Sequence, residues 1–191
     1  MKEVEILVKV KSDKEEVLNK LSKFNFAGKK EILDIYFYDK DRESLKPKNN
    51  RLWECFRLRK KDKKNYITYK VDKFDNLGKW IYSEEEETEV KSFDTAVKII
   101  SLLGLTPLVE IYNTKHTYYT NKYEIVLEEV KDLGLFLEVE RLKVEDKEDI
   151  MLVKKEIFNF IKSLNIETGE ELNSGKPELM LNKQGVLKNE R

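Results

Sequence analysis

Cysteine is almost absent from this sequence, because only Cys55 among the 191 residues carries a thiol. A lone cysteine cannot form an intrachain disulfide, which predicts a protein of the reducing cytoplasm. Long apolar runs are also missing, since no stretch approaches the ~18 residues that a membrane-spanning helix needs. The polar stretch MKEVEILVKV does not resemble a secretory signal peptide. We therefore expect a cytoplasmic protein without a membrane partner.

The chain also lacks a net charge. Lysine and arginine number 37, and so do aspartate and glutamate, although charged residues make up 39% of the sequence. This balance argues against a general nucleic-acid binder. No internal repeat or low-complexity linker is present, and the length suits one domain with a tail. We place the domain at 1–165 and a weakly ordered, polar C-terminal tail at 166–191.

Alternation of apolar and polar residues is the dominant pattern of the chain. It predicts strands over residues 3–11, 34–38, 53–60, 66–72, 80–90, 109–119, 123–130 and 135–143. The short connections between them predict antiparallel neighbours. Helices are predicted over 14–24, 95–103 and 148–163. Together these elements predict a mainly β, α+β fold: a single closed antiparallel eight-stranded β-barrel, or tunnel, with helices packed outside.

Several predicted strands carry one apolar face and one face of like charges. In the first strand Val4 and Ile6 lie on the face opposite Glu3 and Glu5, and in a later strand Arg57 and Arg59 share one face. The pattern continues at Lys70, Glu138 and Glu140. One interpretation is that the charged faces are solvated, as in most antiparallel sheets. The other is a charged lumen, in which carboxylates hold a hard cation and Arg or Lys hold phosphate oxygens.

The motifs also occur in a recognisable order. They are Glu3-Val-Glu5, DIYF at 34–37, FRLR at 56–59, ITYK at 67–70 and LGLFLEVE at 133–140. This ordered set resembles the CYTH, or triphosphate tunnel metalloenzyme, superfamily, and is closest to its class IV adenylyl cyclase-like branch. The sequence departs from that pattern at Leu7, Ser83 and Asn113, where the family carries cations.

The resemblance implies roles for individual side chains. The implied ligands of Mg²⁺ or Mn²⁺ are Glu3, Glu5, Glu87, Glu128, Glu138 and Glu140. The implied phosphate-binding residues are Lys9, Arg57, Arg59, Lys70 and Lys115. The expected catalytic set is Glu3, Glu5, Arg57, Arg59 and Lys70, with Tyr36 and Trp53 as candidate substrate contacts. Solvated glutamates and plain salt bridges are the alternative interpretation of the same residues.

The resemblance implies a metal-dependent enzyme that acts on a triphosphate inside a charged β-tunnel. The branch favours a class IV-type adenylyl cyclase, which converts ATP into cyclic AMP and pyrophosphate. A triphosphatase acting on tripolyphosphate, thiamine triphosphate or a nucleotide is the alternative, and a non-catalytic nucleotide- or polyphosphate-binding module is the third hypothesis. The expected partner is a small triphosphate molecule, and a homodimer is common in this family.

Overall fold

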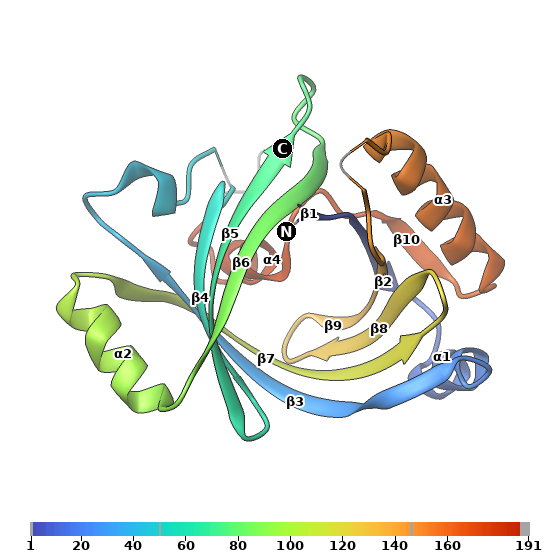
Figure 1. Ribbon diagram of the computed structural model, residues 1–191, viewed down its shortest axis with the longest axis horizontal. Helices are drawn as coiled ribbons and strands as arrows, with labels where there is room; N and C mark the ends of the chain where they lie inside the picture. Colours follow the sequence, from blue (N-terminus) through green and yellow to red (C-terminus); the bar gives the residue numbers. More distant parts are fainter. Residues whose placement is uncertain (1, 50, 146, 188–191) are drawn as a thin grey trace.

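Strands are the commonest element of this computed structural model, which describes residues 2–49, 51–145 and 147–187. In these ranges they are β1 (Lys2–Glu3), β2 (Glu5–Val10), β3 (Asn25–Tyr38), β4 (Glu54–Lys61), β5 (Lys64–Phe74), β6 (Trp80–Val90), β7 (Thr106–Tyr119), β8 (Tyr123–Val130), β9 (Gly134–Arg141) and β10 (Thr168–Glu171). All of them belong to one antiparallel sheet with the order β1-β6-β5-β4-β3-β7-β8-β9-β2-β10. The sheet curves around an interior, as Figure 1 shows.

The mainly β fold is as predicted, but the closed eight-stranded barrel is wrong. The described sheet has ten strands and forms an open half-barrel, because β1 lies at one edge and β10 at the other. The first predicted strand divides at Val4: the part before it pairs with β6, and the part after it pairs with β9. The additional strand β10 pairs with β2.

Four α-helices lie in the described ranges: α1 (Lys14–Leu21), α2 (Phe93–Leu102), α3 (Ile150–Ser163) and α4 (Lys176–Lys183), besides a short 3-10 turn at Glu43–Leu45. The first three match the predicted helices. Each begins at a side-chain cap, as Asp13 accepts from Glu15 N, Ser92 from Thr95 N and Asp149 from Met151 N. No helix in these ranges is long and apolar enough to span a membrane.

Alternation along the strands sends apolar side chains to the convex face of the sheet. Ile6 and Val8 of β2 pack there against Val17 of α1 and Ile157 of α3. A second cluster places Ile100 of α2 with the strand residues Ile35, Phe37 and Leu58. These three helices therefore cover the outside of the sheet, as expected, and leave the alternate side chains of each strand on the concave face.

The stretch after residue 165 is more ordered than the sequence predicts. It forms β10 and α4, and α4 packs on the concave side, where Met180 and Leu181 contact a cluster that includes Leu7, Tyr36 and Phe136. Pro177 at the start of the helix was the available sequence signal. The domain boundary at residue 165 remains a prediction, which a truncation can test.

A buried lysine joins elements from the two edges of the sheet. Lys154 of α3 donates to the carbonyl oxygen of Trp80 in β6 at 2.8 Å. The same ammonium lies 2.6 Å from a carboxylate oxygen of Glu171 in β10. Because the lysine side chain is only 6% exposed, both contacts are shielded from water. The contacts of Lys154 therefore link α3, β6 and β10.

Replacing Lys154 by Met should lower the free energy of unfolding by about 3 kcal/mol, because Glu171 would lose its buried partner and keep the more exposed Lys79, 3.0 Å away, while the Trp80 carbonyl would lose its donor. For a chain of this size, that corresponds to a fall in Tm of roughly 6–12 °C. Thermal unfolding followed by circular dichroism checks this. The control is Lys155→Met, which changes the adjacent, exposed lysine. Equal Tm values for the two variants would contradict the role given to Lys154.

Candidate functional site

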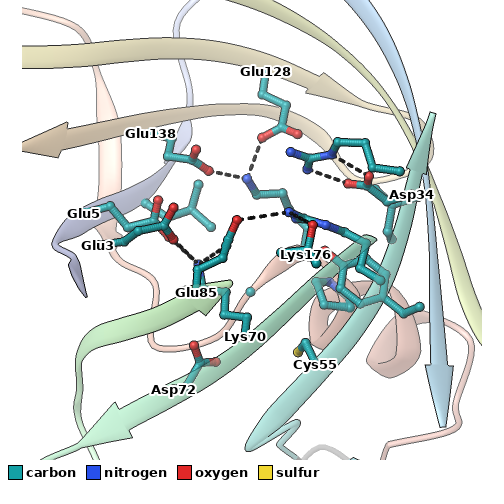
Figure 2. Close-up of a pocket in the computed structure, with 18 of the residues that line it drawn as sticks. Glu3, Glu5, Asp34, Cys55, Lys70, Asp72, Glu85, Glu128, Glu138 and Lys176 are labelled. Atoms are coloured by element: carbon teal, nitrogen blue, oxygen red, sulfur yellow. Dashed lines mark hydrogen bonds and ion pairs between the residues drawn. The ribbon is translucent and has the colours of Figure 1, made fainter. Parts of the chain in front are cut away.

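The concave face of the sheet encloses a cavity of about 200 Å³. Its walls are alternate residues of the strands. One end is closed by α4 and by the segment that leads into it, and the lining residues at this end run from Asn173 to Glu178. Figure 2 shows that charged side chains from opposite walls point toward one another across this space. A cavity lined by paired charges can exchange its internal ion pairs for a charged ligand.

Lys70 of β5 is the centre of the first charged group. Its ammonium lies 3.0 Å from a carboxylate oxygen of Glu3, 3.5 Å from one of Glu5 and 3.9 Å from one of Glu85. Glu85 and Lys70 occupy directly opposed positions of β6 and β5. Strand register therefore places three carboxylates around one lysine.

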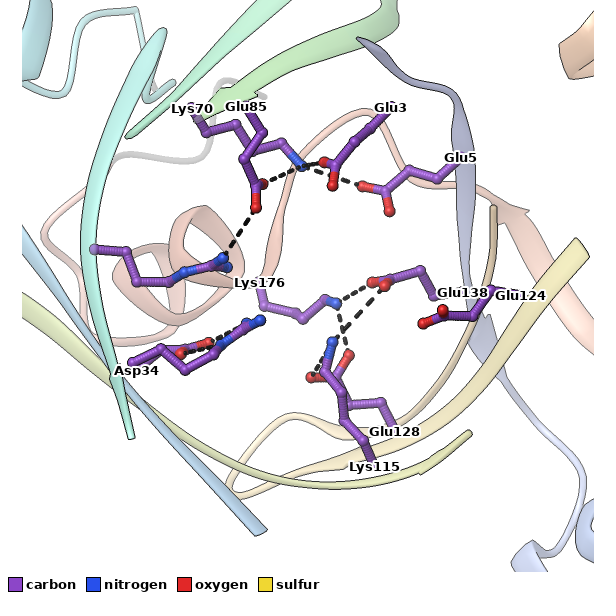
Figure 3. Close-up of polar contacts among 12 residues, drawn as sticks. Glu3, Glu5, Asp34, Lys70, Glu85, Lys115, Glu124, Glu128, Glu138 and Lys176 are labelled. Atoms are coloured by element: carbon purple, nitrogen blue, oxygen red, sulfur yellow. Dashed lines mark hydrogen bonds and ion pairs between the residues drawn. The ribbon is translucent and has the colours of Figure 1, made fainter. Parts of the chain in front are cut away.

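Lys176 of α4 is the centre of the second group, on the other side of the cavity (Figure 3). It donates to Glu128 at 2.6 Å and also to Glu138. Lys115 of β7 lies 3.7 Å from each of the same two carboxylates. Burial opposes ionisation of Glu138, but Lys115 and Lys176 hold the pKa of that carboxyl well below its usual range. Glu128 and Glu138 are thus shared between a strand lysine and a helix lysine.

The two arginines of β4 form the third group. Arg59 makes a two-pronged contact with Asp34, from Nε at 2.7 Å and from Nη2 at 2.8 Å. Burial alone would raise the pKa of Asp34, but Arg59 and Arg57 lower it to about 2. Arg57 lies 3.5 Å from Glu85 and donates to Thr68 at 3.2 Å. Both guanidinium groups therefore line the cavity in fixed orientations.

Negative charge is in excess around Glu5 and Glu140, which are directly opposed in β2 and β9. Burial, together with the neighbouring carboxylates Glu5 and Glu3, raises the pKa of Glu140 to about 8. Burial also raises the pKa of Glu5 to about 7, against the opposing charge of Lys70. A divalent cation would relieve this repulsion, and carboxylate oxygens are the ligands that Mg²⁺ and Mn²⁺ prefer.

The donor set therefore fits a hard divalent cation in its chemistry. Within the described residues, however, no three acidic side chains are already gathered as a metal-binding group. Lys70 and Lys176 instead neutralise the carboxylates that such an ion would use. Binding of a cation at these acids thus requires the lysines to give up their contacts.

Most of the residues implied by the sequence lie together in this cavity. They are Glu3, Glu5, Tyr36, Arg57, Arg59, Lys70, Lys115, Glu128, Glu138 and Glu140. Three lie outside its lining. Lys9 is exposed beside the ring of Phe136, Glu87 is exposed and accepts from Thr68, and Trp53 packs its ring against Phe74.

Sequence reasoning missed eight of the charged residues in the lining, which are Lys30, Asp34, Lys61, Asp72, Glu85, Glu124, Lys176 and Glu178. Glu85 has the alternation signal of its strand, but it was hidden in the run Glu84–Glu87. Asp34 belongs to the recognised DIYF segment and was not assigned a role. Lys176 gave no signal, because only the path of α4 brings it into the cavity. Lys176 supplies a cation to a lining in which Leu7 stands at an expected cation position.

Stability of the metal-free protein should fall as pH rises from 6.5 to 8. A carboxyl whose pKa is raised by folding contributes stability that is complete below its unfolded pKa and is lost as pH rises through the folded value. Glu5 and Glu140 lose this stabilising contribution as the pH rises through their pKa values, which are about 7 and about 8. Burial lowers the pKa of His116, so its contribution to stability increases as pH rises. This opposite effect belongs to the range below the ordinary pKa of 6.5.

The measurement is Tm against pH in the presence of a chelator, compared with Glu140→Gln. The variant should show a shallower fall because one titrating group is gone. A Tm that stays constant or rises between pH 6.5 and 8 in the wild-type protein would contradict the excess of negative charge in the cavity.

Comparisons with known proteins place this sequence and fold beside those of one family. The sequence model of the CYTH domain matches residues 1–174. A "Putative adenylate cyclase" of Methanocaldococcus jannaschii is 33% identical over 168 residues, which are 87% of this chain and 91% of that protein. A solved protein of Pyrococcus horikoshii has a TM-score of 0.77 at 26% identity, covering 94% of this chain and 99% of that one. A Hippeastrum protein, described as a putative adenylyl cyclase with a dominant triphosphatase activity, has a TM-score of 0.65 at 17% identity, covering 96% of each chain.

Proposed function

The chain belongs to the CYTH domain family, and from this premise we propose that it is a metal-dependent enzyme that cleaves a triphosphate bound in the concave cavity. The observation that carries the proposal is the presence of two opposite sets of charges on one enclosed surface. Arginines and lysines suit phosphate oxygens, and clustered carboxylates suit a divalent cation. A module that only binds anions would have no use for the carboxylates.

The cations of the cavity would hold the substrate. Arg57 and Arg59 would exchange Glu85 and Asp34 for phosphate oxygens, and Lys70, Lys115 and Lys176 would do the same as point charges. Glu3, Glu5, Glu138 and Glu140 would hold Mg²⁺ or Mn²⁺. When bound, such an ion neutralises charge on the phosphates and on the leaving group. A carboxylate of the cavity that does not hold the ion would accept the proton of an attacking water.

Among the possible reactions we favour hydrolysis of a small inorganic triphosphate. The cavity of about 200 Å³ is smaller than the roughly 300–1,000 Å³ usual for larger organic ligands. The two aromatic residues considered for substrate contact are already engaged. Tyr36 is buried in the cluster under α4, and Trp53 packs on Phe74 while its indole donates to the carbonyl of Lys48. Trp53 also lies outside the lining of the cavity, so it offers no stacking surface to a nucleobase bound there.

Adenylyl cyclase activity is the second candidate. It is supported by the name of the Methanocaldococcus jannaschii relative, with which this chain shares 33% identity over most of its length. Cyclisation requires the ribose 3′-hydroxyl to lie in line with the phosphate that is attacked, so it needs room for the nucleoside.

The cytoplasmic location and the homodimer stay predictions.

A product assay separates these candidates. The purified protein is offered tripolyphosphate, ATP and thiamine triphosphate in parallel, with Mg²⁺ or Mn²⁺. We expect orthophosphate from tripolyphosphate and no cyclic AMP from ATP. Formation of cyclic AMP and pyrophosphate would instead show that the reaction is cyclisation and not hydrolysis. Tight binding without turnover of any substrate would instead identify a binding module.

A further inference from the structure

Two half-buried lysines of the cavity lining form no ion pair with a carboxylate among the described residues. Lys30 of β3 and Lys61 of β4 both belong to its walls. Within the part of the chain that the structure describes, neither forms an ion pair with an acidic side chain, whereas Arg57, Arg59, Lys70, Lys115 and Lys176 all do. Lys30 and Lys61 thus differ from the other cations of the lining.

The surroundings of Lys61 confirm that positive charge is in excess at this place. Burial, together with Lys30, Arg59 and Lys115, lowers the pKa of Lys61. Glu124 is the carboxylate that opposes this effect, and its oxygen already accepts the hydroxyl of Tyr119 at 2.5 Å. Asp34 is held by Arg59. A bound anion would supply the counter-charge that these side chains do not.

The two lysines lie far from the end that α4 closes. On β3, Tyr36 packs in the cluster under α4, and Lys30 lies six residues away on the same face, roughly 20 Å along an extended strand. On β4, Lys61 follows Arg59 at the next position of that face, about 7 Å further on. Lys30 is directly opposite Lys115 of β7. The cations therefore continue outward beyond Arg59, and Lys30 lies level with Lys115 in the strand register.

We propose that Lys30 and Lys61 form a subsite for a further phosphate group, so that the preferred substrate is a linear inorganic polyphosphate of four or more phosphates. The inference rests on the proposed function, because the inner cations would hold the first three phosphates. Because α4 closes one end of the cavity, a longer phosphate chain can extend only toward these lysines. An uncharged nucleoside placed there would leave both ammonium groups without a counter-charge, whereas a phosphate neutralises them.

The experiment compares kcat/KM for phosphate release from tripolyphosphate and from tetraphosphate, with Mg²⁺ present. If neither is turned over, the two Kd values are compared by calorimetry. We expect the wild-type protein to prefer tetraphosphate by about tenfold, as one added charge-assisted contact predicts. Because the lysines are half-exposed, this preference should shrink as salt is added. In Lys30→Gln/Lys61→Gln the ratio should fall to about 1–2.

The matched control is Lys29→Gln/Lys60→Gln, which changes the exposed neighbours on the opposite face of the same two strands and should keep the wild-type ratio. A wild-type ratio near 1, or an equal loss in both double variants, would overturn the subsite and leave the proposed function intact. Failure of both polyphosphates to bind would overturn the two proposals together.

Discussion

Replacing Glu5 by Gln should reduce phosphate release from tripolyphosphate by about a thousandfold without destabilising the protein. The amide keeps the shape of the side chain but loses the charge that a divalent cation requires, and electrostatic stabilisation of this kind is worth several kcal/mol. Burial raises the pKa of Glu5, so a neutral side chain is tolerated at this position. We therefore expect an unchanged or higher Tm in the absence of metal.

The combination of the two readouts distinguishes loss of function from loss of fold. Glu84→Gln is the control, because Glu84 is half exposed on β6, outside the cavity lining, and its carboxylate lies 2.9 Å from Lys73. That variant should keep nearly all activity. Activity of Glu5→Gln within about tenfold of the wild type would mean that Glu5 does not hold the metal.

Ending the chain at residue 165 should abolish cooperative folding. The truncation removes β10, which pairs with β2, and α4, whose Met180 and Leu181 are buried in the concave cluster. It also removes Leu187, another buried member of that cluster. Burial of such side chains is worth about 1.5–3 kcal/mol each, against a total stability of about 5–15 kcal/mol for a typical domain. Loss of the sigmoidal thermal transition in circular dichroism is the expected result.

A point variant tests the same contact more gently. Leu181→Ala, at a fully buried position, should cost about 2–5 kcal/mol. Val186→Ala, at an exposed position of the same segment, should cost little. If the chain of residues 1–165 unfolds cooperatively with the Tm of the full protein, the boundary at residue 165 is that of an independent domain.

The period of two along the strands made much of the fold predictable. It assigned Ile6 and Val8 to the packed face and Glu3 and Glu5 to the other, and the structure places them so. Closure could not be predicted in the same way. The first strand pairs with β6 before Val4 and with β9 after it, yet its sequence alternates without interruption. Alternation shows which face of the sheet a side chain lies on, but it does not show which strand is the neighbour.

The cavity itself was predictable only where strand alternation defines it. Arg57, Arg59 and Lys70 lie on the expected face, whereas Lys176 reaches the cavity through tertiary packing of α4. Leu7 illustrates the same limit from the other side. The family pattern leads one to expect a cation there, but the position is buried against the helix that brings in Lys176. A missing charge in one strand and a new one on a distant helix can be related only once both are placed in space.

Phosphate release from tripolyphosphate, measured with and without a divalent cation, tests the central claim most directly. The protein is first treated with a chelator and then titrated with Mg²⁺ or Mn²⁺ under otherwise constant conditions. The account predicts no release in the chelator and a rate that rises to saturation with the added ion. Release that is equally fast in the chelator, or absent at every concentration of both ions, would contradict a metal-dependent triphosphate-cleaving enzyme.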